Sequence, residues 1–79
     1  MIRIIKNRRL KELRYVLKQS IKSYEGLYGE ANVVSLAADC GLDMRELFDC
    51  IEGTSTIINY YQRIIRTLNK ATIYHQEVI

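Results

Sequence analysis

Proline and tryptophan are absent from this chain of 79 residues, which contains only two cysteines, one histidine and one phenylalanine. Two cysteines and one histidine exclude a disulfide framework and a four-ligand zinc site within a single chain. No apolar run approaches the roughly 20 residues that span a bilayer, so we expect no membrane partner. The length fits one domain, residues 1–79, and excludes a large multi-layer enzyme.

The opening MIRIIKNRRL is interrupted by charge at Arg3 and lacks the apolar stretch of a secretion signal. We therefore expect a cytoplasmic protein. Hydrophobic residues make up 48% of the chain and charged residues 27%, which is typical of a folded domain and too apolar for a disordered one.

Charge is distributed unevenly along the chain, although the net charge is only +3. Residues 1–24 contain eight basic side chains and a single acidic one, Glu12. Residues 25–60 contain seven acidic side chains and a single basic one, Arg45. A basic segment of this kind indicates a polyanionic partner, and the alternative interpretation is an ordinary solvated helix surface.

Apolar residues recur every three or four positions early in the chain, which predicts an amphipathic helix over residues 7–24. Its buried stripe would consist of Leu10, Leu13, Leu17, Ile21 and Tyr24. We expect Gly26 and Gly29 to end this helix in a short loop. The β-branched opening, residues 2–5, fits either a short strand or a packed lead-in.

Capping signals divide the middle of the chain into two short helices. Asn32 occupies an N-cap position before a helix that Gly41 is expected to stop. Asp43 and Glu46 have the spacing of a capping box at the start of a third helix, which Gly53 would end. The inward-facing residues of the two helices would be Val33, Leu36, Ala37, Cys40, Leu47, Cys50 and Ile51.

A fourth helix is predicted over residues 57–68, after three hydroxyl residues that are able to cap it. Its buried stripe would be Ile57, Tyr61, Ile64, Ile65 and Leu68. Residues 71–79 fit either a strand or a frayed helix end. We therefore expect an all-α fold, a compact bundle of four to five helices containing a helix-turn-helix, with at most short terminal strands.

Two short helices joined by a tight turn at Gly41 follow the plan of a helix-turn-helix. Gly41 can adopt the left-handed backbone conformation that reverses the chain without a Cβ clash. The segment Ser35–Gly53, SLAADCGLDMRELFDCIEG, resembles the helix-turn-helix of the Cro and phage-repressor (XRE-like) family in its Leu-Ala pair, its glycine, its mid-helix leucine and its closing Glu-Gly. The segment Arg9–Arg14, RLKELR, is similar to the first helix of that family, and the resemblance covers residues 9–68.

The resemblance implies a small sequence-specific DNA-binding transcriptional regulator of the repressor type, with no cofactor, that places its third helix in the major groove of an operator. We expect a homodimer, because one short recognition helix discriminates weakly between base sequences. The residues expected near base edges are Met44, Arg45, Phe48 and Asp49, and Asp43 at the start of the same helix is also expected at the DNA interface. The residues expected to contact phosphates are Asn32, Thr54 and Ser55.

The acidic residues of the third helix support a second interpretation. Asp43, Glu46, Asp49 and Glu52 would repel phosphates, and a helix with this charge suits a basic protein partner. The chain would then be a helix-turn-helix scaffold for protein binding, such as an antitoxin, an anti-repressor or a phage-encoded inhibitor.

Residues arranged for catalysis or metal binding are missing from the sequence. It shows no Ser-His-Asp or Cys-His pairing, no glycine-rich phosphate loop and no plausible pair of catalytic carboxylates, so we do not expect an enzyme. Cys40, Cys50 and His75 match no zinc spacing. The two cysteines fall on apolar helix faces, and we expect them to be buried, reduced thiols without metal.

Overall fold

The computed structural model describes residues 2–78, with side chains described for residues 8–75. These residues form four helices, α1 (Ile2–Tyr28), α2 (Val33–Cys40), α3 (Met44–Glu52) and α4 (Ile58–Val78), and no strand. The predicted all-α fold is therefore confirmed. The sequence left open a short strand at residues 2–5 and another at residues 71–79. Residues 2–5 and 71–78 are helical, so neither segment forms a strand within the described range.

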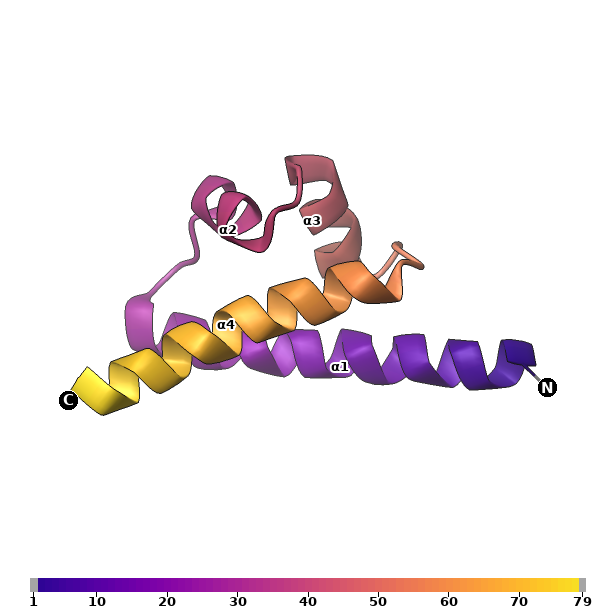
Figure 1. Cartoon of the computed structure of the whole chain (residues 1–79), viewed down its shortest axis with the longest axis horizontal. Helices are drawn as coiled ribbons and strands as arrows, with labels where there is room; N and C mark the ends of the chain where they lie inside the picture. Colours follow the sequence, from indigo (N-terminus) through magenta and orange to yellow (C-terminus); the bar gives the residue numbers. More distant parts are fainter. Residues whose placement is uncertain (1, 79) are drawn as a thin grey trace.

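The two long helices, α1 and α4, lie side by side and run in the same direction (Figure 1). The hydroxyl of Ser20 donates a hydrogen bond to Asn69 at 3.3 Å, and the hydroxyl of Tyr28 donates one to the carbonyl oxygen of Ala71 at 2.7 Å. A parallel pair of helices needs a connection that returns the chain to its starting end. The short helices α2 and α3 make that connection over one side of the pair.

The core lies where α2 and α3 pack onto the α1–α4 pair, and all four helices contribute to it. Full burial of a leucine or isoleucine side chain contributes about 1.5–3 kcal/mol relative to leaving it exposed. The buried apolar residues are Leu10, Leu13, Leu17, Leu36, Ala37, Cys40, Leu42, Leu47, Cys50, Tyr61, Ile64 and Leu68. The predicted stripes of α1, α2 and α3 are thus confirmed, with Ile21, Tyr24, Val33 and Ile51 partly buried at their edges.

Local capping sets the bounds of α2 and α3, as predicted. The Asn32 side chain accepts a hydrogen bond from the backbone N–H of Ser35 at 3.1 Å. Gly41 ends α2 with φ of 70°, and the following N–H of Leu42 donates to the carbonyl of Ala37 at 3.0 Å. The N–H of Gly41 also donates to the carbonyl of Ala38 at 3.1 Å. These two backbone bonds around a left-handed glycine form a Schellman motif, and Gly53 ends α3 in the same way with φ of 82°.

Both long helices extend further than the sequence pattern predicted. Helix α1 continues through Gly26 to Tyr28 and ends at Gly29, so the prediction that both glycines lie in a loop is wrong for Gly26. Helix α4 begins at Ile58 and continues to Val78, about ten residues beyond the predicted end. Each extension has a partner, because the hydrogen bond from Tyr28 to Ala71 joins the late turns of the two helices.

One residue of the predicted core lies elsewhere. Ile57 precedes α4 and leaves 46% of its surface exposed, so the prediction that it belongs to the buried stripe is wrong. The backbone N–H of Ile57 donates to the hydroxyl of Ser55 at 3.2 Å, and this bond holds the residue in the loop before the helix. Tyr61, Ile64 and Leu68 form the buried stripe instead, with Ile65 partly buried.

Candidate nucleic-acid interface

The first two turns of α3 expose three of the side chains that the sequence placed near base edges, Met44, Arg45 and Phe48. Arg45 is exposed, and Met44 and Phe48 leave 37% and 43% of their surfaces exposed. An exposed cation beside exposed apolar side chains is available to an external partner, whether nucleic acid or protein.

Two of the acidic residues at the start of α3 cap the helix. The Asp43 carboxylate accepts from the N–H of Glu46 at 2.8 Å, and the Glu46 carboxylate accepts from the N–H of Asp43 at 2.9 Å. That backbone hydrogen bond, a further one from the Tyr60 hydroxyl and the nearby charge of Arg63 lower the pKa of Glu46. Both carboxylates are therefore directed to the helix terminus, although Asp43 is exposed at the candidate interface.

The other residues predicted to contact DNA near the ends of α2 and α3 form hydrogen bonds within the protein. Asn32 is exposed, and its side-chain oxygen accepts the capping hydrogen bond of α2 while its amide N–H groups are not part of that cap. Thr54 is exposed, and its hydroxyl donates to the carbonyl oxygen of Asp49 at 3.2 Å. Asp49 itself is half-buried at the edge of α3. Asn32 and Thr54 remain accessible to a phosphate.

Ser55 is not accessible, which contradicts the prediction that it contacts phosphates. Its exposed fraction is 8%, and its hydroxyl accepts a hydrogen bond from the N–H of Ile57. Its carbonyl oxygen accepts hydrogen bonds from the hydroxyl of Tyr61 at 2.8 Å and from the guanidinium of Arg14 at 3.4 Å. The role of Ser55 is therefore to join the α3–α4 loop to the two long helices.

Arg14 is a structural residue that the sequence did not distinguish from its basic neighbours. It is half-buried, and its Nε donates to the hydroxyl oxygen of Tyr61 at 3.3 Å. Arg14 lies one residue after Leu13 and three before Leu17, and this position at the edge of the apolar stripe indicates a side chain that is partly buried. Arg14 therefore contributes to cohesion between segments rather than to the basic surface.

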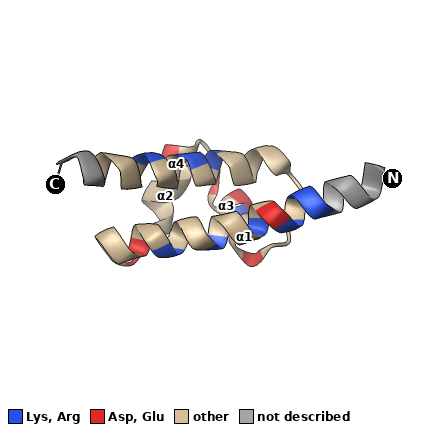
Figure 2. Ribbon diagram, turned by 90° about the horizontal axis from the view of Figure 1, so that it is seen from below, with Lys and Arg blue, Asp and Glu red and all other residues tan. Residues whose placement is uncertain are grey.

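The structure separates the charges by element. Cations occur along both α1 and α4, which face the viewer in Figure 2. The exposed cations of the two helices are Arg8, Arg9, Lys11, Lys18, Lys22, Arg63, Arg66 and Lys70. A groove of about 800 Å³ between the helices includes Arg9, Arg66 and Lys70 in its lining. The segment from Asn32 to Ile57, in contrast, contains Arg45 as its only cation together with the carboxylates of Asp39, Asp43, Glu46, Asp49 and Glu52.

Both cysteines are buried, as predicted. Cys40 on α2 and Cys50 on α3 leave 7% and 1% of their surfaces exposed, and neither forms a disulfide. Burial raises the pKa of both thiols, with a smaller contribution to Cys40 from the charge of Asp39. The described residues contain no group of three or more histidine, cysteine or acidic side chains placed to hold a metal ion.

Comparisons with known proteins return no match to this chain among protein-family models, curated proteins or solved structures. None of the helices within residues 2–78 combines the length and the apolar character needed to cross a membrane. The site is therefore defined by its own geometry: a capped pair of short helices, α2 and α3, mounted on two long basic helices.

Proposed function

We propose that this protein is a small sequence-specific DNA-binding transcriptional regulator that presents α3 to the major groove and binds as a homodimer. The observation that carries the proposal is the exposure of Arg45 in the first turn of α3, the second helix of a capped helix-turn-helix. A guanidinium at this position is able to donate two hydrogen bonds to the O6 and N7 atoms of guanine. Asn32 and Thr54 would contact the flanking phosphates.

The cations of α1 and α4 support the proposal by providing attraction to phosphates that does not depend on base sequence. Capping also reduces the repulsion expected from α3, because the carboxylates of Asp43 and Glu46 are bonded to backbone N–H groups. A homodimer would present two copies of α3 to two half-sites, and their binding free energies would add approximately.

The test is selection of preferred sites from a pool of random duplex DNA, followed by titration of selected and unrelated duplexes at two salt concentrations. Arg45→Ala should remove roughly 1–3 kcal/mol of discrimination at one base position per half-site. It should leave the fold and the binding of unrelated duplexes nearly unchanged. Lys18→Ala, an exposed cation on α1, is the matched control and should leave base preference intact. An unchanged preference in Arg45→Ala would refute the assignment of α3 as the recognition helix.

The excess of carboxylates on α2 and α3 favours a second candidate function, a scaffold that binds a basic protein through α3. Glu52 distinguishes the two candidates because it is exposed and lies outside the capping box. If α3 faces DNA, Glu52→Gln should tighten DNA binding by removing repulsion. Absence of DNA binding at low salt, with loss of a basic protein partner in Glu52→Gln, would favour the scaffold.

A further inference from the structure

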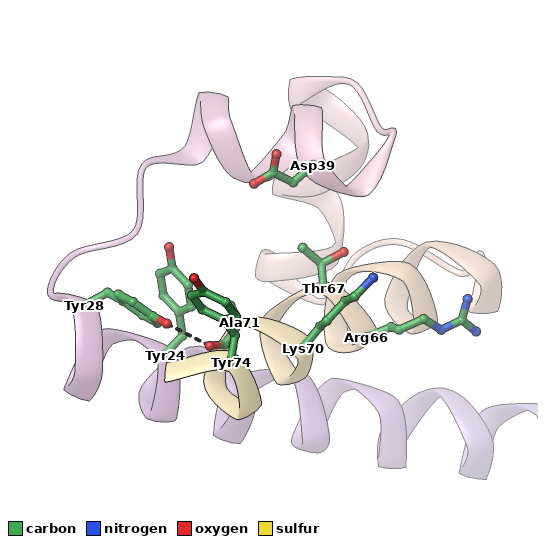
Figure 3. A pocket seen from close by; sticks show the side chains of 8 residues that line it. All are labelled: Tyr24, Tyr28, Asp39, Arg66, Thr67, Lys70, Ala71 and Tyr74. Carbon is green, nitrogen blue, oxygen red and sulfur yellow. Dashed lines mark hydrogen bonds between the residues drawn. The ribbon is translucent and has the colours of Figure 1, made fainter. Parts of the chain in front are cut away.

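A second concave site lies away from the exposed face of α3, between the end of α1, helix α2 and the later turns of α4 (Figure 3). Its volume is about 670 Å³, within the range of roughly 300–1,000 Å³ that is usual for small-molecule pockets. Half of the six tyrosines of the chain line it. The side chains that bear on the argument are Tyr24, Tyr28, Asp39, Thr67, Lys70 and Tyr74.

The aromatic wall of the pocket is held in place by its own contacts. The hydroxyl of Tyr28 donates a hydrogen bond to the carbonyl oxygen of Ala71 at 2.7 Å. The rings of Tyr24 and Tyr28 have centroids 4.8 Å apart, and the edge contact between Tyr28 and His75 is 5.1 Å. Because the rings of Tyr24 and Tyr28 are held by these contacts, a ligand that stacks on them loses little free energy to ordering them.

The rings also leave surface available to a ligand. Tyr74 exposes 66% of its surface and Tyr28 exposes 44%. Figure 3 shows the three tyrosines grouped on one side of the pocket, with Thr67 and Lys70 on the other and Asp39 reaching toward it from α2. Three aromatic rings, two cations (Arg66 and Lys70) and the carboxylate of Asp39 therefore line the same pocket.

We propose that this pocket binds a nucleotide, with the base against the tyrosines, the phosphate at Lys70 and an exocyclic amino group at Asp39. A planar ring suits exposed aromatic faces, and stacking of a base on such a face does not require a particular base sequence. A phosphate suits the ammonium group of Lys70, and Arg66 at the rim adds positive charge. Both side chains extend away from the tyrosines, so the phosphate would lie at the opposite end of the pocket from the stacked base (Figure 3). These two cations disfavour a cationic ligand in the aromatic wall. The pocket is independent of the DNA-binding function proposed for α3.

Adenosine monophosphate is the first probe, and the signals of the tyrosine rings in NMR spectra are the readout. We expect saturable shifts of the rings of Tyr24, Tyr28 and Tyr74. The ring of Tyr15, which lies on α1 and is 65% exposed, should not shift. Adenosine lacks the phosphate and ribose 5-phosphate lacks the base, so each should bind roughly tenfold more weakly or worse.

Two pairs of variants test the two ends of the ligand. Tyr74→Leu should weaken binding of adenosine monophosphate roughly tenfold, because it removes a stacking face, whereas the equally exposed Tyr15→Leu should have no effect. Lys70→Gln should weaken binding of adenosine monophosphate and leave binding of adenosine unchanged. Lys18→Gln, which removes an exposed cation from α1, should change neither.

The nucleotide has two sources, a free molecule or a single strand of nucleic acid, and a short oligoadenylate distinguishes them. An oligoadenylate that binds no more tightly than adenosine monophosphate assigns the pocket to a free nucleotide. One that binds at least roughly tenfold more tightly, with the same ring shifts, assigns it to a strand. Absence of saturable ring shifts with either probe at millimolar concentration would overturn the proposal. Equal affinity of the Tyr74→Leu variant and the wild type would also overturn it.

Discussion

The hydroxyl group of Tyr61 donates a hydrogen bond of 2.8 Å to the carbonyl oxygen of Ser55. Tyr61 is fully buried on α4, and Ser55 lies in the loop that follows α3. Arg14 on α1 donates to the same carbonyl oxygen and to the hydroxyl oxygen of Tyr61. Arg14 precedes Ser55 by 41 positions, so α1 meets the α3–α4 loop and the start of α4 at one carbonyl group. The end of α3 is thereby held against the two long helices.

We expect Tyr61→Phe to lower the free energy of unfolding by about 1–3 kcal/mol, because it removes the shortest hydrogen bond to a buried carbonyl group. The measurement is urea unfolding followed by circular dichroism. Tyr15→Phe, at a position that is 65% exposed, is the matched control and should leave stability nearly unchanged. Equal stability of Tyr61→Phe and the wild type would mean that the three-way contact at Ser55 adds little.

Two glycines should respond to alanine with opposite signs. Gly41 has φ of 70°, a conformation that strains the backbone of an alanine. A Cβ added at this position would lie 3.7 Å from its nearest neighbour, Nη1 of Arg63, so backbone strain rather than a steric clash opposes the substitution. Gly41→Ala should therefore destabilise the protein by about 1–2 kcal/mol. Gly26 is helical, with nothing within 4 Å of an added Cβ, and Gly26→Ala should stabilise by about 0.5–1 kcal/mol. The measurement is thermal unfolding of the two variants. Changes in melting temperature of the same sign in both variants would contradict the prediction.

The capping box at α3 predicts a dependence of stability on pH. Hydrogen bonds from the backbone N–H of Asp43 and from Tyr60 lower the pKa of Glu46 below its usual 4.5. The ionised Glu46 carboxylate therefore stabilises the folded protein fully above pH 4.5, and this stabilisation is lost as the pH falls through the lowered pKa. The bond to Glu46 raises the pKa of Tyr60 above its usual 10.0, so that contribution is present below this pH and is lost as the pH rises through the raised pKa.

The measurement for this prediction is urea unfolding of the wild type and of Glu46→Gln across the acid range. Glutamine keeps the cap but carries no charge, so the wild type should be the more stable at neutral pH. The difference should vanish as Glu46 becomes protonated. Glu52→Gln, at an exposed position outside the capping box, should show no such convergence. A difference that stays constant down to acid pH would contradict the role assigned to Glu46.

The two cysteines should resist alkylation while the protein is folded. Burial limits access to Cys40 and Cys50 and raises the pKa of both thiols, so the reactive thiolate is scarce at neutral pH. Mass spectrometry after treatment with iodoacetamide should show slow labelling in buffer and rapid labelling in urea. Rapid labelling of both thiols in buffer, or stoichiometric zinc in the purified protein, would contradict the prediction of buried thiols without metal.

If DNA is the partner, the basic start of α1 should add affinity for all duplexes alike. Replacing Arg8, Arg9 and Lys11 with glutamine should weaken binding to selected and unrelated duplexes by similar factors. Each phosphate contact that is lost should reduce the slope of log affinity against log salt by about 0.9. Circular dichroism should confirm that the variant keeps its fold. An unchanged slope would place this part of α1 away from the DNA.

The bounds of α2 and α3 were predictable from the sequence because their signals act within one helical turn. Asn32 and the pair Asp43 and Glu46 provide caps made by residues three positions apart. Gly41 and Gly53 provide the left-handed conformation that ends each helix, whatever packs around it. The exposure of Met44, Arg45 and Phe48 followed from the same periodicity that buried Leu47 and Cys50.

The ends of α1 and α4 and the fate of individual polar side chains were decided only by tertiary structure. The periodic stripe of α4 stops near Leu68, yet the helix continues to Val78, and the hydrogen bond between Tyr28 and Ala71 joins its extension to α1. Arg14 and Ser55 are residue types that usually lie at the surface. They are 41 positions apart in the sequence, but the guanidinium of Arg14 donates a partly buried hydrogen bond to the carbonyl oxygen of Ser55. Periodicity and capping report only on neighbours within a few residues, whereas these outcomes depend on which distant segment the fold brings alongside.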